Sequence, residues 1–502
     1  MTMLTMQDLS PIIRDIEGHA RNFGLDFFPV IFEMLDDEQI NMVASYGGFP
    51  TRYPHWRFGM QYEYMQKSYG YGLHKIYEMV INNNPCYAYL LNSNQLVDQK
   101  LVIAHVFAHC DFFKHNAYFR NTNRRMMDEL ANHGNRIHDY MSRYGQNEVE
   151  DFIDTCSSLE NLIDARLLFE DTARQRGNTD GDEPPVRDVP RLRSKSYMES
   201  FINPPELIEA QRREIEEMKK PALSGGDLKD VLGFLIEHAP LPNWKRDILS
   251  MLREEAYYFA PQAQTKIMNE GWASYWHEKI MTRCVLNASE LVDFADHHSS
   301  TLAVHPGQLN PYKLGYELYC DIERRWNTGR FGKEYDECDD IAQRAAWDRH
   351  TGMGMEKIFQ VRAIYNDMTF IDEFLTEEFC REQKLFTYSL NERNNRYEMA
   401  DRGFAAVKEK LLFALTNMGH PHIAVVDANH ENRGELLLRH RFDGVELRRD
   451  FATATMEALQ RIWSRPVHLE TVSAQAPLLL SYDGTRHSEK TLIAETAAEV
   501  TA

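Results

Sequence analysis

The central stretch of the sequence, residues 86–119, reads CYAYLLNSNQLVDQKLVIAHVFAHCDFFKHNAYF. Over residues 94–115 its apolar side chains recur at helical spacing, so we expect one long helix there. Residues 74–81 and 86–91 are rich in tyrosine, leucine and β-branched side chains, and Asn-Asn-Asn-Pro separates them. Because asparagine and proline form turns, this order predicts a pair of strands that leads into the helix.

Two histidines of this helix are the first candidates for chemistry. His105 and His109 are four residues apart, so they lie on the same helical face, one turn from each other. Such a pair can meet one tetrahedral metal ion, and a strand pair before such a helix is the order found in zincin metalloproteases. Val106 stands where the His-Glu-x-x-His motif has its catalytic glutamate, which weakens the signal.

A second motif, NEGWAS at residues 269–274, supplies a carboxylate. It resembles the third-ligand motif of gluzincin peptidases, in which a second helix gives a glutamate to the metal. Glu270 and His277 fall on one helical stripe with two small residues between them, which would allow close approach of the two helices. His105, His109 and Glu270 thus form a His₂Glu set for Zn²⁺ or another divalent ion, with an open fourth position and His277 as a candidate further ligand.

Two features depart from the gluzincin pattern. The gap between His109 and Glu270 is wider than we expect of a gluzincin. With Val106 in place of glutamate, the proton acceptor that hydrolysis requires must also come from elsewhere. The candidates for this catalytic group are Asp111, Glu278 and His298.

Two other interpretations of the histidines stay open. His105, His109 and His115 match the spacing of a metzincin motif, but Phe112 stands where that motif needs a glycine to turn the chain. Alternatively, the pair are core histidines hydrogen-bonded to their neighbours, and Glu270 is a buried carboxylate paired with an arginine or a histidine.

The composition narrows the class of protein. With 502 residues, 43% hydrophobic and 26% charged, the chain should fold into two or three domains. A net charge of −20 argues against general binding to nucleic acid. No apolar run is long enough for a membrane span, and the first residues do not resemble a secretory signal. Seven scattered cysteines without a Cys-x-x-Cys pair fit a reducing compartment, so we expect a cytoplasmic protein.

We expect an α+β protein with a mainly helical body, in which a short β-sheet precedes a zincin-like active helix, and a small C-terminal α+β domain. Residues 1–173 and 228–380 would form the body, with 174–227 as a linker, a surface excursion or an ordered arm. Residues 381–472 would form the small domain and 473–502 a flexible tail. The predicted strands of the small domain are 384–390, 423–426, 434–440 and 467–469, and its predicted helices are 402–415 and 451–463.

Several blocks of the sequence resemble one family. Residues 86–119 resemble the signature block of the stage V sporulation protein R (SpoVR-like) family. MNEGWASYWHEKI at 268–280 and LNPYKLGYELYCDIERRWN at 309–327 are similar to two further hallmarks, and 416–471 resembles the family's end domain. The resemblance spans residues 10–472. His115 stands where we expect asparagine, which argues further against the metzincin interpretation.

This resemblance implies a bacterial cytoplasmic protein linked to spore cortex formation, or to stationary-phase and stress responses in bacteria that do not sporulate. It also implies a serine kinase and a von Willebrand-type protein as associated partners, and it brings no molecular activity. One hypothesis is a divergent zincin-like metalloprotein that acts on a peptide, an amide or a cell-wall fragment. Another is a non-enzymatic regulator that binds a protein partner. A third is a structural metal that joins two helices, with His277 or another group as fourth ligand.

Overall fold

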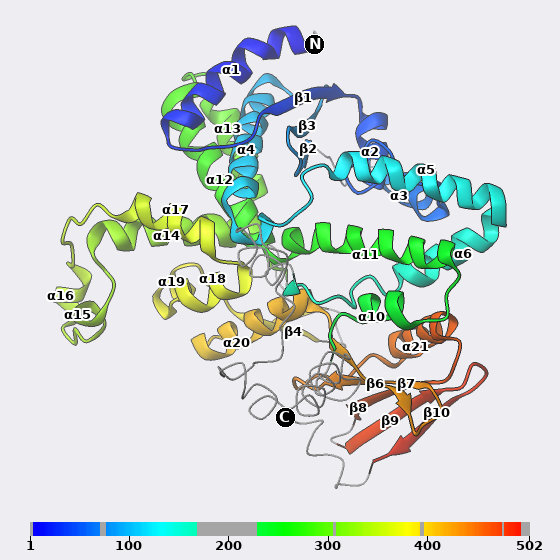
Figure 1. The fold of residues 1–502 in the computed structure, drawn as a ribbon. Helices are drawn as coiled ribbons and strands as arrows, with labels where there is room; N and C mark the ends of the chain where they lie inside the picture. The colour runs from blue at the N-terminus through cyan, green and yellow to red at the C-terminus, as the bar shows by residue number, and fades with distance from the viewer. Residues whose placement is uncertain are drawn as a thin grey trace, which may run out of the picture. The chain divides into compact units, whose positions relative to one another are not determined.

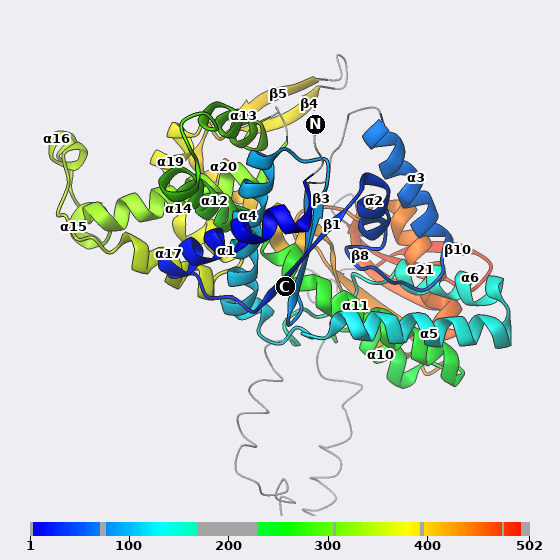
Figure 2. The same ribbon diagram turned by 90° about the horizontal axis from the view of Figure 1, so that it is seen from above.

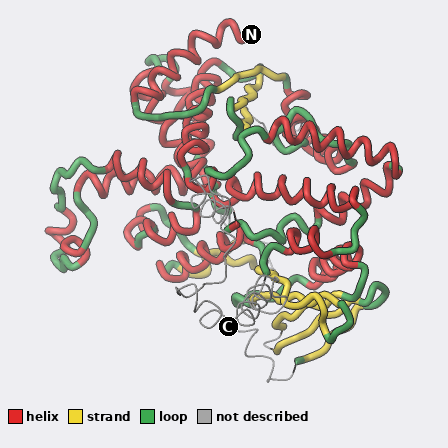
Figure 3. The backbone as a smooth tube through the Cα atoms, viewed as in Figure 1, coloured by secondary structure: helices red, strands yellow, loops and turns green. Residues whose placement is uncertain are grey.

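The computed structural model describes residues 4–70, 77–167, 228–304, 308–391, 396–473 and 476–492. These residues are mainly helical and include three small sheets, which confirms the expected α+β class (Figure 1; Figure 3). The chain divides into two compact units. Unit 1 combines Met1–Asp151 with Tyr257–His420, and unit 2 combines Phe152–Ala256 with Pro421–Ala502.

The limits of these units differ from the predicted domain limits at 173 and 380. Helix α20 (Phe404–Leu415) belongs to unit 1 because Val407 lies in its core and Leu411 packs against that core. At the other limit, residues from Phe152 onward group with the C-terminal strands. The predicted linker, 174–227, lies wholly outside the described residues, and so do residues 493–502 of the predicted tail.

Unit 1 begins with helices and a three-stranded sheet. The elements are α1 (Met6–Asn22), β1 (Val30–Leu35), α2 (Asp37–Ser45), α3 (Trp56–Gly70), β2 (Glu78–Ile81) and β3 (Cys86–Leu91). β2 pairs antiparallel with β3, as predicted, and residues 74–76 of the predicted first strand lie outside the described residues. The sequence did not indicate β1, which pairs parallel with the other edge of β3. Since the partners of a parallel pair are far apart in the chain, no local turn signal marks it.

Helix α4 (Leu96–His115) is the predicted histidine helix, and it forms the centre of unit 1. Every residue from 101 to 113 is buried. A helix that is apolar on all sides packs inside a protein rather than on its surface. Helices α1 and α12 (Lys266–Ile280) pack along it, and Figures 1 and 2 show α4 and α12 side by side. Beyond α4 the chain continues into η1 (Ala117–Phe119), α5 (Met126–Tyr144) and α6 (Gln146–Ser157).

The second part of unit 1 is helical around α12. Its other helices are α13 (Leu291–Thr301), α14 (Pro311–Thr328), α15 (Lys333–Asp336), α16 (Ile341–Ala345), α17 (Gly354–Ile364), α18 (Asp367–Phe374) and α19 (Glu377–Glu382). Between α12 and α13 lies the π-helical turn η2 (Met281–Val285), and a strand pair, β4 (Thr387–Asn391) with β5 (Arg396–Asp401), precedes α20. The Asp367 carboxylate accepts hydrogen bonds from the backbone N–H groups of Ile267 and Met268, at 2.8 and 2.9 Å. It thereby caps the first turn of α12, which carries Glu270.

Unit 2 contains a five-stranded sheet in the order β10-β9-β8-β7-β6. The strands are β6 (His422–His430), β7 (Glu435–Arg441), β8 (Val467–Ser473), β9 (Ala476–Tyr482) and β10 (His487–Thr491). Helix α21 (Arg449–Trp463) connects the parallel strands β7 and β8, and α10 (Val231–His238) belongs to the same unit. Helix α11 (Asn243–Gln264) contributes residues to both units.

The structure corrects the prediction of a flexible C-terminal tail. Residues from 473 were expected to be flexible, yet β9 and β10 extend the sheet there. The residues of β10, HSEKT, are all exposed, so this edge strand carries no apolar alternation that the sequence could reveal. Separately, none of the helices in the described ranges combines the length and apolar character of a membrane span.

Candidate metal centre

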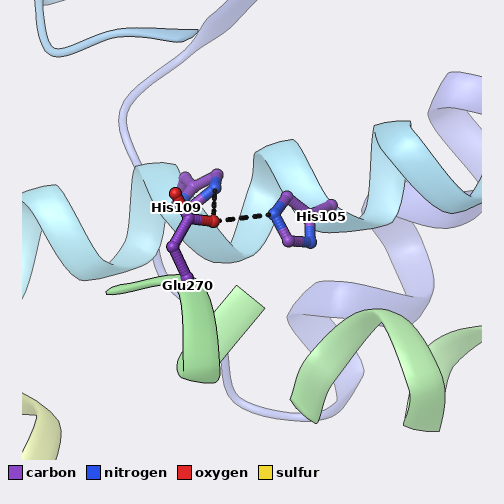
Figure 4. A group of neighbouring side chains, drawn as sticks. All are labelled: His105, His109 and Glu270. Carbon is purple, nitrogen blue, oxygen red and sulfur yellow. Dashed lines mark ion pairs between the residues drawn. The ribbon is translucent and has the colours of Figure 1, made fainter. Parts of the chain in front are cut away.

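Three predicted ligands meet between α4 and α12. His105 and His109 lie on α4 with ring centroids 4.5 Å apart, and Glu270 faces them from α12 (Figure 4). Glu270 Oε2 lies 3.4 Å from His105 Nε2 and 3.5 Å from His109 Nε2. All three residues are buried, and their ligand atoms lie within 4.8 Å of one another. In the part of the chain that the structure describes, no other group of three such residues could hold a metal ion.

These distances suit ligation better than hydrogen bonding. Zinc binds nitrogen and oxygen at about 2.0–2.2 Å, so two ligands of a tetrahedral ion lie about 3.3–3.5 Å apart. A good N–H···O hydrogen bond has about 2.7–3.2 Å between its heavy atoms. Glu270 Oε2 is buried and has no hydrogen-bond partner, which is unusual for a buried polar atom.

The second ring nitrogen of each histidine and the second carboxylate oxygen of Glu270 already have hydrogen-bond partners. His109 Nδ1 donates to Asn269 Oδ1 at 2.9 Å, and His105 Nδ1 lies 2.9 Å from His277 Nδ1. Lys266 Nζ donates to Glu270 Oε1 at 2.6 Å. Metal-bound histidines in proteins are oriented in this way through their second ring nitrogen. The arrangement leaves two Nε2 atoms and one carboxylate oxygen directed at a common point.

Electrostatics favour an ionised Glu270 and a neutral His105. Burial opposes ionisation of Glu270, but His109, His105 and Lys266 outweigh it and hold its pKa well below the usual value. Burial and neighbouring His109 lower the pKa of His105 to about 4. Burial also acts against the charged form of His109, yet Glu270 and Asn269 raise its pKa. An ionised carboxylate and a neutral imidazole are the forms that bind metal.

Comparison with known proteins identifies the family. A family model described as "SpoVR like protein" matches residues 3–420, and one described as "SpoVR-like C-terminal domain" matches 421–474. The chain belongs to the SpoVR-like family. The limit between the two SpoVR-like models coincides with a limit between the two compact units, at His420 and Pro421.

A relative in Escherichia coli (strain K12), "Uncharacterized protein YcgB", is 29% identical over 464 residues. The alignment covers 87% of this chain and 86% of the relative. No solved structure matches the chain. The comparisons therefore give the SpoVR-like chain a family and no activity.

His277 and His298 form a chain of imidazoles behind His105. His277 Nε2 lies 2.9 Å from His298 Nδ1, and its Nδ1 faces His105. Burial lowers the pKa of His277 well below the usual value, and burial with neighbouring His297 lowers that of His298. Both residues are thus neutral partners that orient His105, and His298 is two hydrogen bonds away from His105.

The structure does not bring Asp111 to the three ligands. Asp111 accepts hydrogen bonds from the backbone of Asp26 at 2.8 Å and from Trp272 Nε1 at 3.0 Å, and it pairs with Arg362. A carboxylate held by three donors in the core anchors α4. Asp111 faces away from the site because a residue two positions after His109 points to another side of the helix.

Three further positions considered in the sequence, Glu278, His115 and Val106, also have surroundings other than the three ligands. Glu278 accepts from the Thr282 hydroxyl at 3.3 Å. His115 Nε2 lies 2.9 Å from the backbone oxygen of Asp26, so it does not complete the metzincin set. Val106 is fully buried in the hydrophobic core.

Two residues near the site were missed from the sequence. Tyr312, in the first turn of α14, stacks on His105 with ring centroids 6.2 Å apart, and burial together with Glu270 raises its pKa. Glu78 of β2 interacts electrostatically with His109 and Glu270. The sequence feature that could have indicated Glu78 is that it is the single acidic residue of a short, otherwise apolar strand.

Proposed function

We propose that this SpoVR-like chain is a metalloprotein that holds Zn²⁺ or a similar divalent ion with His105 Nε2, His109 Nε2 and Glu270 Oε2. One observation carries the proposal. A buried carboxylate oxygen without a hydrogen-bond partner lies 3.4 and 3.5 Å from two imidazole nitrogens, at the ligand separation of a tetrahedral ion. The metal would neutralise the carboxylate and use both nitrogen lone pairs.

The proposed reaction is hydrolysis of a peptide or amide bond, in a peptide or a cell-wall fragment. When bound, the ion would polarise a carbonyl group and lower the pKa of a coordinated water. Lys266 holds Glu270 Oε1, so that Oε2 faces the histidines. Asn269 and His277 fix the rings of His109 and His105 through Nδ1. The set is gluzincin-like in ligand type, with the glutamate beside the first histidine absent.

A structural metal with four protein ligands is less well supported. It would require His277 as the fourth ligand. His277 Nδ1 lies 2.9 Å from His105 Nδ1, and its Nε2 lies 2.9 Å from His298 Nδ1. Because both ring nitrogens have imidazole partners, His277 has no lone pair to offer without breaking this chain. Three protein ligands leave a position for water or substrate, as in catalytic sites.

The second candidate function is a non-enzymatic regulator that binds a protein partner. The apolar Val106 at the position of the missing glutamate favours it. Further proposals rest on the family resemblance alone. They are a cytoplasmic role in cell-envelope, spore-cortex or stress physiology, and association with a serine kinase and a von Willebrand-type protein.

Metal analysis of the purified full chain tests the main proposal. Inductively coupled plasma mass spectrometry should find one equivalent of a transition metal, and a folded His105→Ala/His109→Ala/Glu270→Ala variant should lack it. His115→Ala is a matched control, because this histidine of the same helix faces Asp26 instead. If neither the chain nor the reconstituted chain holds metal, the proposal is wrong and the regulator becomes the better candidate.

A further inference from the structure

We propose that Glu78 supplies the proton acceptor that Val106 cannot supply, so that a carboxylate from strand β2 replaces the glutamate missing from helix α4. The inference rests on the proposed metal centre. It assigns the general base of that centre to a residue from a different element, and none of the sequence candidates takes this role.

The register of the sheet directs Glu78 toward α4. In the antiparallel pair, Glu78 lies opposite Leu90, and Val80 lies opposite Ala88. Leu90 and Ala88 belong to the same hydrophobic core as the buried face of α4, and Val80 packs against it. Met79, the residue between, packs against a different cluster. Since side chains alternate along a strand, Glu78 and Val80 share the face that is covered by α4.

The electrostatic neighbours of Glu78 include two of the proposed metal ligands. Its carboxylate interacts with His109 of α4, with Glu270 and Lys266 of α12, and with His297 of α13. It also influences Tyr312 of α14. All of these groups surround the three proposed ligands or the residues that support them, although they come from helices in different parts of unit 1. Burial is the main cause that raises the pKa of Glu78, to about 7.

Glu78 is close to the ligands without being one of them. The described group that can hold one ion consists of His105, His109 and Glu270, and Glu78 is outside it. Within the described ranges, no hydrogen bond or ion pair engages its carboxylate. By contrast, Asp111 is held by Arg362 and Trp272. Glu78 is therefore the carboxylate that remains able to take a proton.

The proposed step balances for amide hydrolysis. One O–H bond of the attacking water breaks, and the proton moves to a carboxylate oxygen of Glu78. The water oxygen bonds to the carbonyl carbon. Glu78 then returns the proton to the amide nitrogen as the C–N bond breaks, so the products are a carboxylic acid and an amine.

The test compares the full chain with Glu78→Gln, and uses Co²⁺ as the probe because its absorption reports on the ligands. Glu33→Gln is the matched control, since Glu33 is an exposed glutamate on β1 of the same sheet. We expect both variants to bind one equivalent of Co²⁺ as the parent chain does. The pH-dependent change in Co²⁺ absorption should shift or disappear in Glu78→Gln alone. Cleavage of an amide substrate, where one is found, should fall about 10²–10⁴-fold.

The outcomes separate this inference from the proposed function. An unchanged pH profile in Glu78→Gln would overturn the role of Glu78 and leave the metal centre intact. Loss of Co²⁺ from a folded Glu78→Gln chain would overturn it too, by making Glu78 a ligand. A parent chain that binds no Co²⁺ would overturn both. Glu78→Asp, which keeps a shorter carboxylate, should give an intermediate pH profile and serves if Glu78→Gln does not fold.

Discussion

Gly271 of α12 and Gly315 of α14 lie backbone to backbone. A Cβ atom on Gly271 would overlap the carbonyl carbon of Gly315, and a Cβ atom on Gly315 would overlap the backbone oxygen of Ile267. The absence of both side chains allows α12 and α14 to cross this closely. Gly271 follows Glu270 directly, and Tyr312 lies about one turn before Gly315, so the crossing fixes both residues near His105.

Gly315→Ala should therefore push α14 away from α12 and disturb the metal centre. Overpacking of this kind costs about 1–3 kcal/mol of unfolding free energy, and we expect weaker metal binding as well. Urea unfolding and a Co²⁺ titration measure the two effects. Gly18→Ala in α1 is the control, because a Cβ there meets nothing within 4 Å and should leave both quantities equal or slightly improved. Equal behaviour of the two variants would contradict the close crossing.

Asn269→Ala should weaken metal binding without removing a ligand. The variant takes away the acceptor that holds His109 Nδ1 at 2.9 Å. Loss of such an orienting partner lowers metal affinity by about 10–100-fold. Competition titration with a chelating dye measures this affinity. Asn269→Asp keeps an oxygen acceptor and should bind at least as tightly as the parent chain, whereas unchanged binding in Asn269→Ala would show that His109 needs no partner.

Much of the site could be predicted from the sequence, because its ligands come from two local patterns. The four-residue spacing of His105 and His109 and the short motif around Glu270 each place a ligand on a helix face. The sequence could not show how the elements around α4 and α12 pack. Glu78, Tyr312 and the Gly271–Gly315 crossing depend on contacts between segments that no local periodicity connects.

Two expectations differ from what the structure shows, for physical reasons. Asp111 was a candidate proton acceptor, but helical geometry turns it toward Arg362 and Trp272. The tail beyond residue 473 was judged from composition, which does not reveal an exposed edge strand such as β10. Helices α4, α12, α20 and α21 and strands β3, β6, β7 and β8 were found because they are marked by apolar periodicity.

Asp111→Ala should destabilise the protein strongly while the ligands of the metal stay in place. Removing one partner of a buried ion pair costs about 3–5 kcal/mol, because Arg362 would keep an uncompensated charge. Thermal and urea unfolding measure the loss. Asp111→Asn, which keeps the acceptor for Trp272 Nε1, should be milder and should bind metal normally. A stable Asp111→Asn chain that binds metal but lacks hydrolytic activity would instead make Asp111 part of the chemistry.

Asp367→Asn should become more stable relative to the parent chain as the pH rises from about 4 to 7. Burial raises the pKa of Asp367 from 3.8 to about 7, although the hydrogen bonds that it accepts from two backbone N–H groups act to lower it. The folded state therefore holds a proton that the unfolded state releases, so stability falls as pH rises through this window, by at most about 1.4 kcal/mol per pH unit. Asparagine cannot ionise and removes this contribution. Urea unfolding at several pH values measures the difference, and a difference that does not change with pH would contradict a buried, proton-holding Asp367.

Removal of metal should lower the stability of unit 1, because the proposed ion joins α4 to α12. A ligand that binds only the folded state adds about 2.7 kcal/mol when its free concentration is 100 times the Kd. Thermal unfolding of the chelator-treated chain should thus show a higher Tm when Zn²⁺ is added back. The His105→Ala/His109→Ala/Glu270→Ala variant should not respond, since it lacks the three atoms that lie within 4.8 Å of one another. An equal rise in both proteins would assign the effect to zinc bound elsewhere, and the buried Glu270 would then be a partner of the two histidines alone.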